Sequence, residues 1–125
     1  MITIDYKSRV PIYDQIASGI IRLKTVGALN DGDKLPSVRA LALKLNINPN
    51  TVQKAYSILE NDGVIFSVSG KGSFISGDEV ATNAIVDTLK SDFKMAVETA
   101  KRMGLTLEQL KEIAETVYEG GTEDD

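Results

Sequence analysis

Three polar side chains near the middle of the chain share one face of a predicted short helix. Asn50, Gln53 and Lys54 all point away from the apolar stripe of that helix. The amides of Asn50 and Gln53 suit bidentate pairing with adenine, which discriminates by about 1–3 kcal/mol, and the ammonium of Lys54 suits a phosphate. The chemistry that these residue types indicate is therefore recognition of nucleic acid rather than catalysis.

Two short amphipathic helices joined by a tight polar turn must position these side chains, within residues 35–60. Ser37 is the expected N-cap of the first helix, and Asn46 suits its end. Asn48 followed by Pro49 marks the start of the second helix, and Gly63 its end. Each helix has one apolar stripe, formed by Val38, Leu41, Ala42 and Leu45 in the first and by Val52, Ala55, Tyr56 and Leu59 in the second. This arrangement is the geometry that enters a DNA major groove.

The residues on either side predict a winged helix-turn-helix domain over 1–76. Residues 2–4 suggest a small edge strand, 11–26 a helix with Ile12, Ile16, Ile20 and Leu23 on one face, and 30–36 a turn-rich connector. Runs 64–68 and 73–75 predict a hairpin, in which Phe66 and Phe74 close the core and Lys71 at the tip reaches a phosphate or a minor groove. The expected fold is mainly α with this small β-hairpin wing.

Residues 77–125 predict a two-helix module with a frayed acidic tail at 120–125. One helix covers about 80–103, and Thr106 with Gln109 predicts a capping box for the last one. Two such short helices bury little in isolation, so they either fold back on their own domain or pair with a second subunit. We favour a homodimer, because two half-sites about 34–36 Å apart need two readers. The expected dimerisation residues are Ile85, Leu89, Phe93, Val97, Leu110, Ile113 and Val117.

Composition narrows the class of protein. The 125 residues contain no cysteine and no histidine, which excludes disulfides and removes the commonest general base and metal ligand. No nucleophile motif or phosphate loop is present, so we predict neither an enzyme nor a cofactor. The lack of a long apolar run predicts no membrane span and a cytoplasmic protein.

Charge is segregated along the chain. The net charge of −4 divides into +3 over residues 1–76 and −7 over residues 77–125. No acidic residue occurs from Lys34 through Leu59, a stretch that also holds Arg39, Lys44 and Lys54. Segregated charge of this kind favours contact between the N-terminal part and DNA.

The same N-terminal part resembles the GntR family of bacterial transcription regulators. The matching motifs are PIYDQI at 11–16, GDKLPSVR at 32–39, Leu41-Ala42, Thr51-Val52, Ala55-Tyr56, Leu59, Gly63 and GKGSF at 70–74. The short two-helix C-terminus resembles the YtrA-type subfamily, which implies a homodimer. The resemblance also implies DNA contacts from Arg39, from Asn50, Thr51 and Gln53, and from Gly70 and Lys71 at the wing tip. The chain departs from the family at Pro49 and Gln53, where many members place a cation.

The sequence therefore predicts a dimeric, sequence-specific regulator of transcription, and it favours a repressor that reads a palindromic operator with the third helix in the major groove. The expected partners are double-stranded operator DNA and a second copy of the chain. A protein-interaction adaptor with the same fold is the alternative, because the total charge is acidic and a winged helix need not bind DNA. Thr51 is also suited to supporting the helix start, and Lys54 to a solvated surface. A small-molecule effector near Ile21 and Phe93 is left open, since no polar cluster identifies one.

Overall fold

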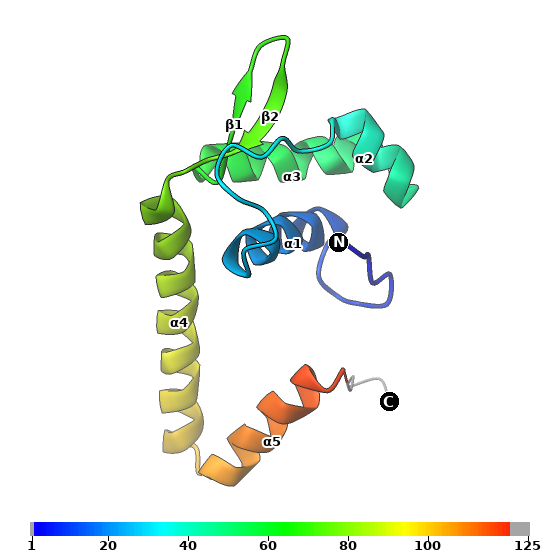
Figure 1. The fold of residues 1–125 in the computed structure, drawn as a ribbon. Helices are drawn as coiled ribbons and strands as arrows, with labels where there is room; N and C mark the ends of the chain where they lie inside the picture. The colour runs from blue at the N-terminus through cyan, green and yellow to red at the C-terminus, as the bar shows by residue number, and fades with distance from the viewer. Residues whose placement is uncertain (1, 121–125) are drawn as a thin grey trace. The chain divides into compact units, whose positions relative to one another are not determined.

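The computed structural model describes residues 2–120, which form five helices and one hairpin (Figure 1). The elements in chain order are α1 (Ile12–Thr25), α2 (Val38–Leu45), α3 (Pro49–Asn61), β1 (Ile65–Val68), β2 (Gly72–Ile75), α4 (Glu79–Arg102) and α5 (Leu107–Tyr118). The chain divides into two compact units, one up to Ala84 and one from Ile85 onward. The mainly α fold with a two-stranded wing is confirmed.

The core of the first unit lies between α1, α2 and α3. The predicted stripes supply it, because residues three and four apart share one helix face and bury together. Its buried side chains include Ile16 and Ile20 from α1, Leu41 and Ala42 from α2, and Val52, Ala55, Tyr56 and Leu59 from α3. Tyr56 is thus a core residue, as predicted.

The helix ends of the central pair are capped as the sequence predicts. The Ser37 hydroxyl accepts from the Ala40 N–H at 3.0 Å, and Asn46 ends α2 in the left-handed region with φ 57°. The Asn48 side chain accepts from the Asn50 N–H at 2.8 Å, with Pro49 as the first helical residue. Two polar caps and one left-handed asparagine therefore set the short turn between α2 and α3.

The hairpin forms at the predicted place, but its aromatic residues do not close the core. β1 and β2 are antiparallel, with Phe66 opposite Phe74 and Ile65 opposite Ile75. Ile65 and Ile75 are buried, whereas Phe66 is 43% exposed and stacks on Phe74 with ring centroids 5.6 Å apart. The prediction for the two phenylalanines was wrong because neighbouring residues of a strand face opposite sides, and the isoleucines occupy the inner side.

The connector before α2 pairs with the wing. The Gly32 N–H donates to the Ile75 carbonyl at 2.8 Å, and the Leu35 N–H donates to the Ser73 carbonyl at 2.9 Å. Lys34 and Phe74 form the bridge between these two bonds. The connector thus occupies the second edge of β2.

The predicted edge strand at residues 2–4 is absent. Instead, Ile2 lies against α1, where a Cβ built on Gly19 would be 3.2 Å from Cγ1 of Ile2. The apolar side chain of Ile2 is used against α1, so these residues pack through their side chains and not through pairing with the hairpin.

The start of α4 is tied to the first unit. The Asp78 carboxylate accepts from the Ala81 N–H at 3.1 Å. The Lys24 ammonium, at the end of α1, donates to the Ser76 carbonyl at 2.9 Å and to the Thr82 hydroxyl at 2.8 Å. The first turn of α4 is therefore held by hydrogen bonds to α1.

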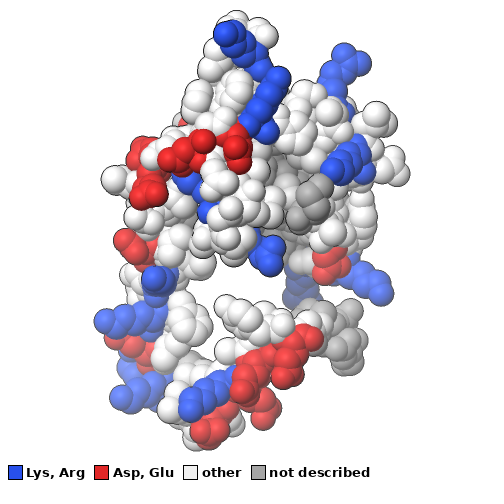
Figure 2. Space-filling model, viewed as in Figure 1, with Lys and Arg blue, Asp and Glu red and all other residues white. Residues whose placement is uncertain are grey.

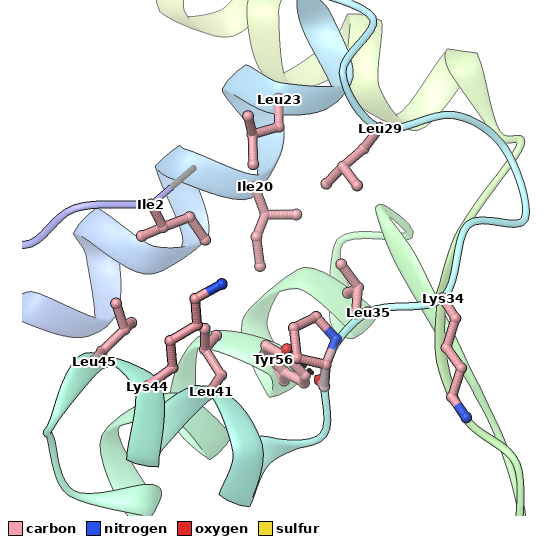
Figure 3. A pocket seen from close by; sticks show the side chains of 11 residues that line it. Ile2, Ile20, Leu23, Leu29, Lys34, Leu35, Leu41, Lys44, Leu45 and Tyr56 are labelled. Atoms are coloured by element: carbon pink, nitrogen blue, oxygen red, sulfur yellow. Dashed lines mark hydrogen bonds between the residues drawn. The ribbon is translucent and has the colours of Figure 1, made fainter.

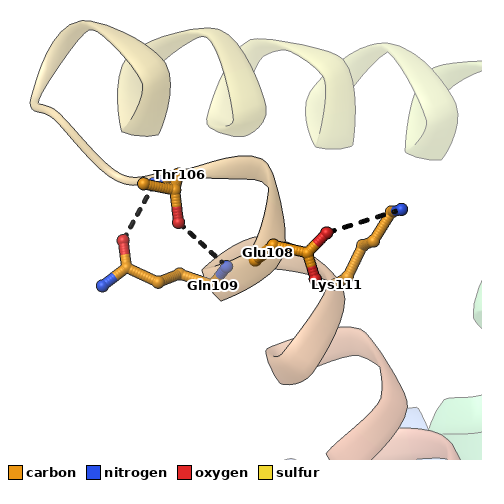
Figure 4. A network of polar contacts seen from close by, with 4 residues as sticks. All are labelled: Thr106, Glu108, Gln109 and Lys111. Atoms are coloured by element: carbon orange, nitrogen blue, oxygen red, sulfur yellow. Dashed lines mark hydrogen bonds and ion pairs between the residues drawn. The ribbon is translucent and has the colours of Figure 1, made fainter.

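The second unit contains the rest of α4 and all of α5. The predicted capping box is confirmed: Thr106 accepts from the Gln109 N–H, and the Gln109 side chain accepts from the Thr106 N–H (Figure 4). Glu108 and Lys111 form an exposed ion pair at 3.9 Å. Residues 121–125 of the predicted frayed tail lie outside the described residues. Within residues 2–120, no helix has both the length and the apolar character needed to cross a membrane.

Candidate nucleic-acid interface

The first turns of α3 present two amides to solvent. Asn50 and Gln53 are exposed, whereas Thr51 is half-buried. The Gln53 amide donates to the Ser57 hydroxyl at 3.1 Å, one turn later on the same face. Both side chains are therefore accessible to solvent, with the Gln53 amide engaged by Ser57, and the half-buried position of Thr51 also suits support of the helix start.

Lys54 lies on the same helix but is held against α1. Its ammonium stands 4.0 Å from the centroid of the Tyr13 ring. A cation over an aromatic face gains about 0.5–1 kcal/mol at an exposed site. A Lys54 ammonium that moved to a phosphate would lose this contact with the Tyr13 ring. The contact between α1 and α3 could not be predicted from the sequence.

Arg39 lies beside the start of α3. It is the second residue of α2 and is exposed, and it lines a shallow groove together with Asn46 and Pro49. The guanidinium is a rigid five-donor fork suited to guanine or phosphate. The structure thus brings Arg39 to the side of the molecule on which α3 begins.

The wing tip carries Gly70 and Lys71, as the sequence predicts. Gly70 has φ 75°, a conformation that glycine adopts without strain, and the Lys71 N–H donates to the Val68 carbonyl at 2.9 Å. Lys34 joins this group, since a Cβ built on Gly72 would lie 3.1 Å from Cε of Lys34. Sequence reasoning assigned Lys34 no site role, because its position on the wing depends on the pairing of the connector with β2.

Among the residues that the structure describes, no carboxylate pairs with the cations of this region. Arg39, Lys34 and Lys71 have no carboxylate within 4.0 Å among residues 2–120, where Glu108–Lys111 is the ion pair found. Figure 2 shows Lys and Arg side chains at the free end of the wing and a row of acidic side chains along α5. The same described range holds no group of three or more Asp and Glu residues placed to bind a metal ion. The positive charge of Arg39, Lys34 and Lys71 therefore suits this surface to an anion, and no metal ion is needed for that.

The predicted dimerisation residues lie on α4 and α5, and most of them are exposed in the single chain. Leu89 and Val117 are each 67% exposed, Phe93 is 66% exposed and Ile113 is 57% exposed. Ile85, Val97 and Leu110 are half-buried. The second unit therefore leaves most of its apolar side chains uncovered.

Comparison with known proteins assigns the class. A family model described as bacterial regulatory proteins, gntR family, matches residues 12–75. The chain therefore belongs to the GntR family of winged helix-turn-helix transcription regulators, which are DNA-binding proteins and not enzymes.

Particular relatives narrow the class further. The chain is 41% identical to the HTH-type transcriptional repressor YtrA of Bacillus subtilis over 100% of both chains. It matches the crystal structure of a transcriptional antiterminator from Listeria monocytogenes EGD-e with a TM-score of 0.76 and 34% identity, covering 94% of this chain and 90% of that one. It also matches the AraR DNA-binding domain in complex with operator ORR3, with a TM-score of 0.52 and 25% identity, covering 58% and 88% of the two chains. The expected YtrA-like subfamily is thus confirmed.

Proposed function

We propose that the chain is a homodimeric repressor that reads a palindromic operator, with α3 in the major groove and the wing at the flanking backbone or minor groove. The observation that carries this proposal is the exposed pair of amides on the first turns of α3, Asn50 and Gln53, beside the exposed Arg39. The amides suit adenine, and the guanidinium suits guanine or a phosphate. One small surface therefore carries donors and acceptors for both adenine and guanine.

The wing supplies the second point of contact. Lys71 at the tip and Lys34 along the strand place two ammonium groups on one hairpin, and neither has a carboxylate partner within the described residues. Contacts to phosphate fix the register of the protein on the duplex without reading its sequence. The complex of the related AraR domain with its operator supports DNA as the ligand of this fold.

The exposed apolar residues of the second unit support the proposed dimer. Leu89, Phe93, Ile113 and Val117 are all more than half exposed, and helices this short do not form a stable core in isolation. A second copy of the same surface would cover the exposed apolar side chains of both subunits at once, because a two-fold interface is self-complementary. The two-fold axis also presents two copies of α3, which suits a palindrome. We place this regulator in the cytoplasm, where a bacterial chromosome is accessible.

The test is selection of bound duplexes from a random library, followed by affinity measurements on the palindrome recovered. Asn50→Ala and Gln53→Ala should each weaken binding by about 1–3 kcal/mol and relax the preference at one base pair. Asn61→Ala, at the far end of the same helix, is the matched control and should bind as the wild type does. Equal affinity of all four proteins for every duplex would remove base readout by these amides.

Salt dependence separates this proposal from a protein-interaction adaptor. Each phosphate neutralised by a cation contributes about −0.9 to the slope of log affinity against log salt concentration. Lys71→Gln and Lys34→Gln should each reduce that slope by about one, with little change in base preference. A slope near zero for the wild type, or no binding to any duplex, would favour the adaptor.

A further inference from the structure

A cavity of about 240 Å³ lies inside the first unit, between α1, α2 and the connector that precedes α2 (Figure 3). Its walls are almost entirely aliphatic, with Ile20 and Leu23 from α1, Leu29 and Leu35 from the connector, and Leu41 and Leu45 from α2. Enclosed apolar cavities stay dry and take apolar guests, and one of about 150 Å³ holds benzene. This pocket has a similar aliphatic lining but is open to solvent beside Pro36 and Lys44. The space here suits a guest of about ten non-hydrogen atoms.

Lys44, an exposed residue of α2, is the charged group whose side chain extends across the mouth of this pocket. Three lining residues carry polar side-chain groups. The Tyr56 hydroxyl is engaged, since it donates to the Pro36 carbonyl at 2.6 Å. Lys34 runs along the wing, with its Cε near Gly72. In Figure 3, Lys44 instead extends from α2 toward α1, and its ammonium ends beside the aliphatic side chains.

Within the described part of the chain, no carboxylate pairs with this ammonium. Lys44 has no ion pair within residues 2–120, and none of the residues that line the cavity is acidic. An ammonium next to an aliphatic wall binds a carboxylate more strongly than a neutral hydroxyl, because charge-assisted hydrogen bonds are about twice as strong as neutral ones. A phosphate is less well suited, since it requires several donors, and of the two lining lysines Lys34 runs along the wing while Lys44 extends toward the aliphatic side chains.

We infer that this cavity is a binding site for a small amphipathic monocarboxylate. The apolar body of the ligand, an alkyl or aryl group, lies among the leucine and isoleucine side chains, and its carboxylate accepts from the Lys44 ammonium. The site does not include Asn50, Gln53 or Lys71, and its carboxylate partner is Lys44 rather than Lys34, so the inference stands without the proposed operator binding. It differs also from an effector site near Phe93, because it lies wholly within the first unit.

The experiment is an NMR titration of the full chain with octanoate, read on the methyl groups of leucine and isoleucine. Octanol and octylamine have the same alkyl chain and serve as neutral and cationic probes. We expect saturable shifts at Ile20, Leu35 and Leu41 with octanoate, at least tenfold weaker binding of octanol, and the weakest binding for octylamine. Equal affinities for the three probes, or no saturable shift at these methyl groups, would overturn the inference.

Variants test the Lys44 ammonium and the aliphatic pocket separately. Lys44→Gln should weaken octanoate about tenfold and leave octanol unchanged, whereas the control Lys90→Gln on α4 should bind both as the wild type does. Leu29→Trp fills the cavity and should abolish both interactions, and Leu45→Phe fills it from α2 if the tryptophan variant does not fold. Octanoate binding that survives a folded, filled cavity would place the ligand elsewhere and refute the site.

Discussion

Tyr56 joins the second helix of the DNA-binding pair to the connector before the first. Its ring is 3% exposed, and its hydroxyl donates to the Pro36 carbonyl at 2.6 Å. Tyr56→Phe keeps the ring and removes this donor, leaving the carbonyl without its partner. A buried acceptor left unpaired costs about 1–3 kcal/mol, and the lower half of that range applies because the bond is part-buried. We expect the variant to be less stable by about 1–2 kcal/mol at pH 7.

The same burial makes the stability difference depend on pH. Desolvation raises the pKa of Tyr56 from 10.0 to about 12. The folded protein therefore holds the phenol proton more tightly than the unfolded chain does, and this contribution is complete below pH 10 and lost as the pH rises through 12. Two pH units at about 1.4 kcal/mol each amount to about 3 kcal/mol, of which about half is lost by pH 11. The phenylalanine variant loses none of it, so the two proteins should become nearly equal in stability at pH 11.

The assay is urea unfolding of both proteins at pH 7 and pH 11, at one fixed protein concentration because the stability of the proposed dimer would depend on concentration. Tyr6→Phe is the matched control, since the Tyr6 side chain is 66% exposed and its change should give no difference at either pH. A gap between wild type and Tyr56→Phe that stays constant from pH 7 to pH 11 would show that the hydroxyl is not desolvated in the folded state. It would refute the reasoning even if the variant were destabilised at pH 7.

Three further changes test caps, glycines and the apolar face of the second unit. Asn48→Ala should lower the free energy of unfolding by about 1 kcal/mol, and an unchanged melting temperature would show that this cap is not formed in solution. Gly63→Ala and Gly27→Ala both place a side chain at positive φ, 80° and 82°, but only the Gly63 Cβ would crowd Ala81, at 3.2 Å. Gly63→Ala should therefore cost more in thermal melts, and equal losses would contradict that crowding. Phe93→Glu places a charge on a 66% exposed apolar face and should shift sedimentation from dimer to monomer; an unchanged mass would place the interface elsewhere.

Local patterns were sufficient to predict most helices. The first helix was expected over 11–26 and spans Ile12–Thr25, and the long helix was expected over 80–103 and spans Glu79–Arg102. Caps such as Ser37 and Asn48 act on backbone groups two or three residues away, so their effect is contained in the nearby sequence. Structural features that depend on residues close together in the sequence can therefore be predicted from the sequence.

Contacts between distant segments were not predictable in the same way. Lys34 lies on the wing because the connector pairs with β2 some forty residues later, and Tyr13 meets Lys54 because α1 packs on α3. The aromatic side chain of Phe66 suggested a core position, but the register of the hairpin decides which face of the strand is buried. The sequence contains no local signal for any of these, since each requires the tertiary arrangement first.

These distant contacts change how the surface would bind DNA. Lys54 counts as a free cation in the sequence, but the Tyr13 ring holds its ammonium at 4.0 Å and reduces what it gains from a phosphate. Lys34 replaces it, because the wing carries this second cation beside Lys71. In the proposed complex, phosphate contacts would therefore come from the wing more than from α3, while the amides of Asn50 and Gln53 remain exposed at the start of α3. Substitutions on α3 should accordingly alter base preference with little change in salt dependence, and substitutions on the wing should do the reverse.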